Sequence, residues 1–375
     1  MVTVKEVTTK RDLRRFVLYP QKLYRDCPQF VPSMYGDDMD NWNKKKNPAF
    51  SYCEAKCFLA YRDGEIVGRI AAILSHKANE KWGQRRMRFS QVDFIDDPEV
   101  SDALFGAVED WAHAMGCDEV HGPLGFTDLD PEGMLVEGFD QRSMFITYYN
   151  HPYYLTHMER LGYQKSVDWM EYKVYTPEKG SRQAAMLERV SNHVLKANRL
   201  HLATVRSKRD YKPLIKKVFE LVNIAYAHLY GTVELSDKQI KRYANKFIPM
   251  INPKYTTFIL DEQDNLVAFG VTAPSMAEAL KKSHGKLFPF GWIGVLRALR
   301  KNNALDMFLI AVHPDMQSVG VNAAVIEHIM KNAWKNGIVY AETGPQLETN
   351  AKILSQWNIF DKEQHKRRRC FIKEL

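Results

Sequence analysis

The sequence of 375 residues lacks a long hydrophobic run. Its longest apolar stretch, from Leu287 to Leu299, contains a proline, two glycines and an arginine, and it falls short of the ~20 residues that a membrane-spanning helix needs. The N-terminal residues MVTVKEVTTKRDL also contain no apolar segment of the kind found in a secretion signal. These absences predict a protein with no transmembrane segment, and we expect a cytoplasmic location.

Cysteine is also scarce, with five residues in the whole chain. Cys53 and Cys57 are close in sequence, but no second pair matches them, so the sequence predicts reduced thiols rather than a metal framework. The acidic segment that begins at Asp128 resembles the start of a calcium loop. Phe139 stands where such a loop needs a bidentate glutamate, and no metal cofactor is therefore predicted.

Charge of one sign is not in large excess, because 53 basic and 45 acidic residues leave a formal net charge of +8. The only sharp basic run, Lys366 to Arg369, is interpreted as a solvated surface. The sequence thus carries no strong nucleic-acid signal. It also contains no Gly-x-Ser-x-Gly elbow, no zinc-protease helix, no Walker loop and no dinucleotide glycine motif.

The sequence does contain an internal repeat. VTTKRD, from Val7, returns as VRSKRD, from Val205, and the predicted hairpin CFLAYRDGEIVGRIAAI returns as TTFILDEQDNLVAFGVTA. In each half an amphipathic helix and a short strand ending in Gly-Pro follow. The order β-α-β-β-β-α-β therefore occurs twice. It predicts two α+β domains of one fold, residues 1–178 and 179–375, with a boundary in the polar segment 175–182.

The most informative stretch is MFLIAVHPDMQSVGVNAAVIEHI, from Met307 to Ile329. It predicts a strand, a short polar turn and a helix. A helix that begins directly after a strand points unpaired N–H groups and the positive end of its dipole at whatever lies above it. Gly320 allows a ligand close to the backbone, and Gln317 can add a side-chain amide. The turn therefore suits a phosphate or pyrophosphate held mainly by the main chain.

The pattern Val312-x-Pro314-x-x-Gln317-x-x-Gly320-x-Asn322 resembles the acyl-CoA loop of the GCN5-related N-acetyltransferase (GNAT) superfamily, V-x-P-x-x-[Q/R]-x-x-G-x-[G/A]. Asn322 departs from it at the last position. The segments GPLGFTDLDPEGMLVEGFD and YYNHPYYLTHMERLGY resemble bacterial proteins with two such domains in tandem. The resemblance implies a mixed α/β (α+β) protein of two GNAT-like acyl-CoA N-acyltransferase domains, each a mixed, mostly antiparallel sheet flanked by helices.

The resemblance also implies acetyl-CoA or another acyl-CoA as the cofactor of the second domain. The residues that it assigns to the donor are Ala311, Val312, Gln317, Ser318, Val319, Gly320, Val321, Asn322 and Asn350. The strand around Ala311 would supply a backbone N–H to the developing oxyanion. The family's usual acid is a tyrosine at the position of Trp357, so the resemblance leaves the general acid unassigned.

The equivalent loop of the first half, VDFIDDPEVSDALF, lacks both the glutamine and the glycine. It offers Asp96, Asp97 and Glu99 where a pyrophosphate would lie, and like charges repel each other at that distance. The first half is therefore predicted to be a degenerate domain that does not bind coenzyme A. We expect it to close the acceptor pocket of the second half, or only to stabilise it.

The expected reaction is the direct attack of a primary amine on the thioester, with Glu342 as the first candidate for the base and Tyr340 as the second. The acceptor is expected to be a small-molecule or peptide amine, and the protein to be a monomer or homodimer. Substrate-binding candidates, for which core or turn roles remain open, are Glu132, Glu137, Asn150, Tyr153 and Tyr154.

Two other functions remain open. An aminoacyl-tRNA or acyl-carrier donor fits the basic net charge, and a non-catalytic sensor of acyl-CoA or an amine fits the tryptophan at position 357. The segment KLFPFGWIGVLRALRK, residues 286–301, interrupts the second half. We expect it to pack on the other domain, to line an acyl channel or to contact a membrane surface.

Overall fold

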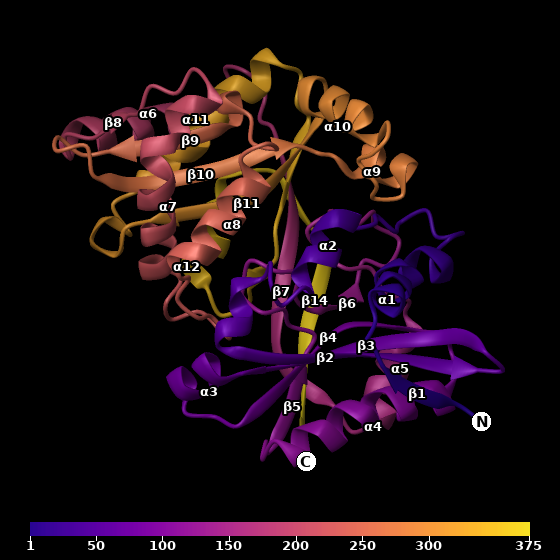
Figure 1. Cartoon of the computed structure of the whole chain (residues 1–375). Coiled ribbons are helices and arrows are strands. Elements are labelled where there is room, and N and C mark those ends of the chain that lie inside the picture. The colour runs from indigo at the N-terminus through magenta and orange to yellow at the C-terminus, as the bar shows by residue number, and fades with distance from the viewer. The chain divides into compact units, whose positions relative to one another are not determined.

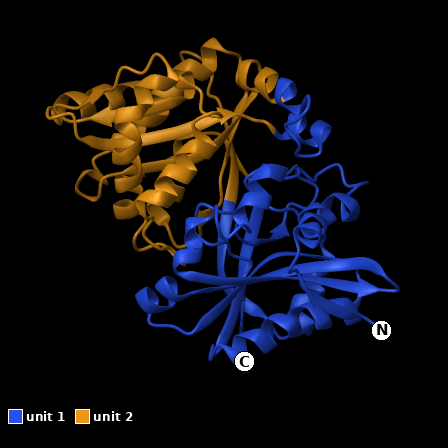
Figure 2. Cartoon of the chain, in the orientation of Figure 1, with its two compact units in different colours: residues 1–170, 277–294, 366–375 blue, residues 171–276, 295–365 orange.

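The computed structural model describes all 375 residues, which form two compact units (Figure 2). Unit 1 comprises residues 1–170, 277–294 and 366–375, and unit 2 comprises residues 171–276 and 295–365. The units are thus interleaved along the chain. A division into domains at residues 178 and 179 stays a prediction.

Unit 1 combines one sheet with helices on both of its faces (Figure 1). Its elements are β1 (Thr3–Glu6), α1 (Lys10–Leu23), α2 (Tyr35–Asn41), β2 (Cys53–Arg62), β3 (Glu65–Ser75), α3 (His76–Trp82), β4 (Arg86–Phe94), α4 (Pro98–Ala114), β5 (Glu119–Gly122), β6 (Met134–Glu137), α5 (Tyr153–Arg160) and α9 (Ala277–Ser283). The strands β1 to β5 lie side by side in chain order, and only β4 and β5 are parallel.

Unit 2 repeats this plan. Its elements are α6 (Arg182–Ala197), β8 (His201–Leu202), α7 (Lys212–Ala225), α8 (Asp237–Phe247), β9 (Thr256–Leu260), β10 (Leu266–Pro274), β11 (Ala304–Val312), α11 (Val321–Lys335), β12 (Tyr340–Thr343), β13 (Gln346–Leu347) and α12 (Ala351–Ser355). The strand order is β8-β9-β10-β11-β12, and only β11 and β12 are parallel. The predicted sheet type, mixed and mostly antiparallel, is confirmed in both units.

Three elements contain residues of both units: β7 (Gln164–Tyr175), α10 (Gly291–Arg300) and β14 (Lys362–Glu374). The unit 2 residues of β7 pair with β12, so that Lys173 lies opposite Glu342. The unit 1 residues of β14 pair with β5 and β6, so that Phe371 lies opposite Gly122. Each sheet is therefore completed by a strand that the repeated sequence assigns to the other half.

One helix in each unit, α4 in unit 1 and α11 in unit 2, packs closely on the sheet. Four residues on one face of α11 are all buried: Val321, Val325, Ile329 and Ala333. A glycine in the strand beneath makes the close approach feasible: a Cβ on Gly270 would lie 2.5 Å from the Val325 side chain, and a Cβ on Gly68 would lie 2.7 Å from Leu104 in α4. The internal repeat thus extends to the packing of helix on sheet.

The interpretation of residues 366–369 as a solvated surface is wrong. Lys366 and Arg368 are 1% and 0% exposed. Arg369 donates to the fully buried carboxylate of Asp168 at 2.7 and 3.0 Å, and Arg367 donates to the same carboxylate at 3.3 Å. The basic run is part of β14, and its charges balance a buried acid. None of the helices has the length and the apolar character that crossing a membrane requires.

Candidate functional site

Two parallel strands part in the middle of unit 2. β11 pairs with β12 from Ala304 to Met307, and the N–H of Gly344 donates to the Met307 carbonyl at 3.1 Å. Beyond this point β11 continues along β10. Met307 and Leu309 lie opposite consecutive residues of β10, so Phe308 is the extra residue of a β-bulge. A bulge bends its strand, and here it leaves the wedge between residues 308–312 and the end of β12.

β11 leads into the loop that the sequence analysis assigned to a phosphate. Ser318 and Gly320 have positive φ angles, +70° and +89°, and they turn the chain so that α11 begins at Val321. Gly320 is the N-cap of α11, and no side chain caps this helix end. The first N–H groups of α11 therefore face the loop, together with the positive end of the helix dipole.

Side chains fix this loop against α12. The Gln317 amide donates to the Val312 carbonyl at 3.3 Å and accepts from the Lys352 ammonium at 3.2 Å. The Asn322 amide donates to Gln356 at 3.3 Å. The asparagine that departs from the family pattern thus has a structural contact, and Lys352 adds a cation beside the loop.

The residues at the start and end of α12 are engaged in structural contacts. Asn350 is the N-cap of α12 and accepts from the N–H of Ile353 at 3.3 Å. Trp357 is 1% exposed, and its indole N–H donates to Gln346 at 3.0 Å. An indole has a single N–H donor. Trp357 therefore holds β13 in place and has no proton to give to a leaving thiolate.

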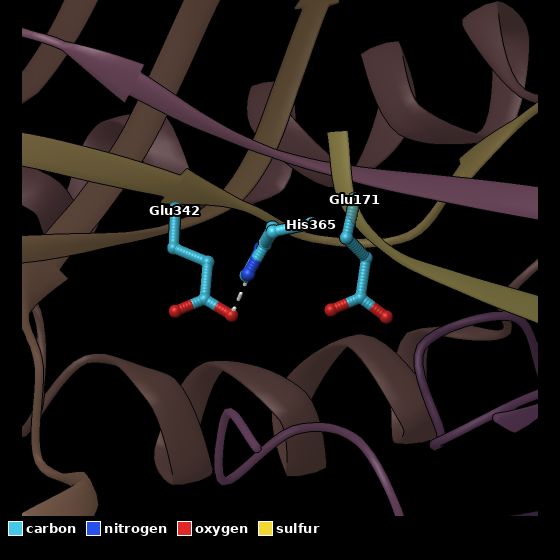
Figure 3. A group of neighbouring side chains, drawn as sticks. All are labelled: Glu171, Glu342 and His365. Atoms are coloured by element: carbon cyan, nitrogen blue, oxygen red, sulfur yellow. Dashed lines mark ion pairs between the residues drawn. The ribbon is translucent and has the colours of Figure 1, made fainter. Parts of the chain in front are cut away.

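A cluster of three ionisable side chains is buried in unit 2 (Figure 3). Glu342 comes from β12, Glu171 from β7 and His365 from β14, and one nitrogen or oxygen atom of each side chain lies within 4.8 Å of the corresponding atoms of the other two. The His365 ring lies between the two carboxylates, with its Nε2 3.5 Å from Glu342 Oε1. None of the three is more than 6% exposed.

The strand register explains how this cluster forms. Glu342 lies opposite Lys173 in β7 and opposite Asp306 in β11. Because strand residues two apart share a face, Glu171 lies on the same face as Lys173. Buried carboxylates need a compensating positive charge. Two carboxylates and an imidazole can meet this need by sharing a proton, and they are also a donor set that suits a divalent cation.

The cluster lies where the strands part. Asp306, opposite Glu342, immediately precedes Met307, the last residue of β11 that pairs with β12. Tyr340 lies two residues before Glu342 on the same face, half-buried, with its ring 6.4 Å from that of Tyr175. The hydroxyl of Tyr226, at the end of α7, donates to the Ile310 carbonyl at 2.9 Å, within the separated part of β11. An acid–base cluster and a tyrosine hydroxyl thus belong to the same region of unit 2.

The equivalent place in unit 1 is filled. β4 and β5 pair only over residues 86–88 and 119–121. Past that point the Tyr154 hydroxyl accepts from the N–H of Phe94 at 2.9 Å, and the Tyr153 hydroxyl donates to the Phe94 carbonyl. Both tyrosines belong to α5. Beyond the end of β4, Asp97 and Glu99 at the start of α4 accept from Arg62 of β2, at 2.6 and 2.8 Å. Two tyrosines of α5 thus bond the strand end in unit 1, whereas in unit 2 the separated part of β11 accepts from Tyr226 at Ile310 and from Gln317 at Val312.

The predicted substrate residues all lie in unit 1, whereas the cluster lies in unit 2. Asn150 is buried and bonds both the N–H and the carbonyl of Leu135, at 2.7 and 3.0 Å. Glu137 pairs with Arg367 at 3.1 Å. Burial, with a contribution from Asp128, raises the pKa of Glu132 well above its ordinary value. A substrate-binding role for these residues and for the two tyrosines stays a prediction.

Unit 1 also contains a hollow, open to solvent, beside α1 and β4. Arg69 and Asp93 form a buried ion pair in its wall, 2.6 Å apart, and Asp93 also accepts from the Tyr24 hydroxyl at 2.8 Å. Burial raises the pKa of Asp93, although Arg69 opposes this effect. The pair is thus held as part of the fold of unit 1.

Sequence reasoning selected Glu342 but missed Glu171, His365 and Tyr226. Glu171 and His365 lie in strands that are 194 positions apart in the chain numbering, and only the strand register brings them together. The alternation of Glu171, Lys173 and Tyr175 indicates a polar strand face, yet it does not say which strand that face will meet. Tyr226 follows the apolar helix α7, and no sequence motif marks its position.

No family model matches the chain. Protein YghO of Escherichia coli (strain K12) is 26% identical to it, over 99% of this chain and 95% of that protein. A bacterial ceramide synthase of Caulobacter vibrioides is 28% identical, over 80% of this chain and 77% of that protein. Among solved structures, a tandem GNAT protein from the clavulanic acid biosynthesis pathway superposes with a TM-score of 0.55, at 12% identity, over 100% of this chain and 98% of that one.

Proposed function

We propose, from the tandem GNAT fold that this chain shares with the clavulanic acid pathway protein, that it transfers an acyl group from acyl-CoA to a primary amine in unit 2. The fold class and the GNAT resemblance expected from the sequence are confirmed by that fold. The observation that carries the proposal is the parting of β11 from β12 next to buried Glu342. It places a strand that has left its neighbour beside an ionisable group.

The donor would lie along this strand. Its pyrophosphate suits the start of α11, where Gly320 admits the ligand and the helix N–H groups and dipole favour an anion. Lys352, held at the loop through Gln317, adds a charge that attracts phosphate. The pantetheine amides can then bond with the main chain of residues 309–312, as a further strand would.

The first unit gives no comparable place for a donor. Its strand edge is bonded to Tyr153 and Tyr154, and its loop presents Asp97 and Glu99 to Arg62. This supports a single coenzyme A site per chain. It also supports the expectation that the first half is a degenerate GNAT domain.

In the proposed reaction the amine nitrogen forms a bond to the thioester carbon, and the carbon–sulfur bond breaks. Glu342 accepts the proton that the amine must lose, and His365 and Glu171 can share this proton with it. Tyr226 gives a proton to the leaving thiolate, a role that Trp357 cannot fill. The products are an amide and coenzyme A, and both catalytic groups are restored when Glu342 loses its proton to solvent and Tyr226 regains one from solvent.

The acceptor is proposed to be a long-chain amine. One relative is named a ceramide synthase, and a ceramide is a long-chain amino alcohol acylated on its nitrogen. The same chemistry, amide formation on an amino alcohol, requires an acyl donor, a base and an apolar place for the chain of the acceptor.

The test is turnover by the full-length protein. Acetyl-CoA and long-chain acyl-CoA are each incubated with short polar amines, peptides and long-chain amino alcohols, and amide and free coenzyme A are quantified by mass spectrometry. The proposal requires stoichiometric amide and thiol. Binding of acyl-CoA without turnover would favour a sensor, and turnover only with aminoacyl-tRNA would favour the other donor. Chelation should leave the rate unchanged, whereas loss of activity would assign the cluster to a metal.

The catalytic roles have their own test. Glu342→Gln should lower kcat by roughly a hundredfold or more and leave coenzyme A affinity unchanged, with a changed pH–rate profile. Tyr226→Phe should lower kcat with every acyl-CoA donor, because all of them release the same thiolate. Glu348→Gln, a half-buried glutamate outside the cluster, is the matched control. An unaltered pH–rate profile in Glu342→Gln would remove Glu342 from the role.

A further inference from the structure

Exposed aromatic side chains gather at one point of the chain. Phe288, Phe290 and Trp292 are 81%, 74% and 44% exposed. They lie within five consecutive residues, in the connection between α9 and the start of α10 (Figure 1). The other exposed large hydrophobic residues outside α10 are dispersed along the sequence. Scattered exposed apolar residues are ordinary, but a concentrated group marks an interaction site.

The charge around this group has one sign. From Ala279 to Leu305 the sequence contains six basic residues and no acidic one. Lys282 and Lys286, the basic residues nearest to the aromatic group on its N-terminal side, are exposed. We call residues 287–292 the aromatic tip and residues 277–286 its base. Aromatic side chains bordered by lysines are typical of segments that lie in the interface of an anionic membrane.

The base is fixed to the rest of unit 1. The Gly285 carbonyl accepts from the N–H of Tyr35 at 3.0 Å, and the His284 carbonyl accepts from Gln21 at 2.8 Å. Glu278 pairs with Arg142 at 3.1 Å. Gly285 has a φ of +69°, and a Cβ there would lie 2.1 Å from the Ser33 carbonyl oxygen, so only glycine fits. The exposed tip is thus mounted on an ordered base and needs little ordering when it binds.

We propose that the aromatic tip inserts into the headgroup region of an anionic lipid bilayer, with Lys282 and Lys286 facing the lipid phosphates. Phe288, Phe290 and Trp292 supply the apolar insertion, and the lysines supply the electrostatic attraction. Gln21 and Tyr35, which hold the base, also line the hollow in unit 1. The bilayer contact is therefore adjacent to a hollow in the same unit. The proposal does not depend on the catalytic assignment.

A bilayer fits this tip better than a second copy of the chain does. Three aromatic side chains bury about 150–250 Å² each, which together is less than the ~800 Å² that a stable protein interface takes from each partner. A protein partner would also need acidic groups opposite the lysines, whereas a bilayer of anionic lipids presents a continuous negative surface.

The experiment measures binding of the full-length protein to large vesicles by co-sedimentation and by the blue shift of tryptophan fluorescence. Vesicles of phosphatidylcholine alone are compared with vesicles that contain one-third phosphatidylglycerol. The wild type should bind the anionic vesicles at least tenfold more tightly. The double variant Phe288→Ser/Phe290→Ser should lose binding to both kinds, and Lys282→Glu/Lys286→Glu should lose the preference for anionic lipid.

The matched control is Met186→Ser, which removes a 51% exposed apolar side chain from α6 and should bind as the wild type does. Circular dichroism establishes that all variants fold. Failure of the wild type to bind, or equal binding by the Phe288→Ser/Phe290→Ser variant, would overturn the proposal. A dimer in light scattering that this variant converts to a monomer would also overturn it, because the tip would then be a protein interface.

Discussion

A glycine lies just before α11 and another lies just after it. Comparing the two distinguishes the effect of backbone strain from the effect on a bound ligand. Gly320, before the helix, and Gly337, after it, have φ angles of +89° and +68°. Both conformations strain any residue with a Cβ. Only Gly320 lies at the end where the positive pole of the helix dipole and the free N–H groups meet a proposed pyrophosphate.

We therefore expect Gly320→Val to weaken coenzyme A binding at least tenfold, because a side chain there strains the left-handed turn, meets Val190 and Val194, and so displaces the first N–H groups of α11. Gly337→Val carries a similar backbone strain and should bind coenzyme A as the wild type does. Calorimetry on both variants measures the difference, and it should also give one site per chain in the wild type. Equal losses in the two variants, or two equivalent sites in the wild type, would contradict the proposed donor site.

A half-buried acid in unit 1, Asp128, gives a pH-dependent prediction. Burial raises the pKa of Asp128 from 3.8 to about 6. Between these two values the folded chain binds more protons than the unfolded chain does, so the contribution of Asp128 to stability falls as the pH rises through this window. Asp128→Asn removes this contribution.

Asp128→Asn should therefore raise the melting temperature relative to the wild type at pH 7 but not at pH 4. The gain in the free energy of unfolding at pH 7 should be at most roughly 3 kcal/mol. Thermal unfolding followed by circular dichroism at the two pH values tests this. A difference between the variants that does not change with pH would show that the Asp128 carboxyl does not titrate differently in the folded chain.

At the scale of elements, β14 shows that the contribution of a charged side chain to stability depends on whether its partner is buried. Arg369 reaches Asp168, whose side chain is fully buried, whereas Arg85 pairs with the exposed carboxylate of Asp118 at 2.6 Å. Removing one partner of a buried pair leaves an uncompensated charge, which is costly. An exposed pair is screened by water and contributes little.

Arg369→Met should accordingly lower the free energy of unfolding by about 2–4 kcal/mol, because Arg367 and Lys165 compensate Asp168 only in part. Arg85→Met should change it by less than about 1 kcal/mol. Urea denaturation of both variants provides the comparison. Similar losses would mean that Asp168 does not depend on β14.

Elements whose signal is local could be predicted from the sequence, and pairings over long distances could not. The hairpin of β9 and β10 and the helix α11 follow from turn residues and from apolar spacing. The polar run of residues 366–369 looks like a surface, because the sequence does not show the buried Asp168 that it meets. Glu342 was predicted as a base from its strand position, but its neighbours Glu171 and His365 depend on the register of β7 and β14.

At the scale of the whole molecule, the exchanged strands decide which fragments can fold. Residues 179–375 alone lack β7, so the edge of β12 has no partner, and the unit 1 part of β14 has no β5 to join. They also lack Glu171. Residues 171–365 retain the pairing of β7 with β12 and all three members of the cluster.

We expect the fragment 171–365 to unfold cooperatively and to bind coenzyme A, whereas the fragment 179–375 should aggregate, because it exposes unpaired strand edges. Circular dichroism melting and calorimetry of the two purified fragments test this. A fragment 179–375 that melts as cooperatively as the fragment 171–365 would mean that the exchange of strands is not needed for folding.

The pairing of Phe371 with Gly122 also has a consequence for synthesis. A ribosome makes roughly 5–20 residues per second, so β5 emerges tens of seconds before the strand that completes it. During that interval the sheet of unit 1 ends in an open edge, the feature that attracts chaperones and promotes aggregation. A variant that lacks residues 366–375 would keep this edge unpaired, and we expect it to aggregate more than the full-length chain does.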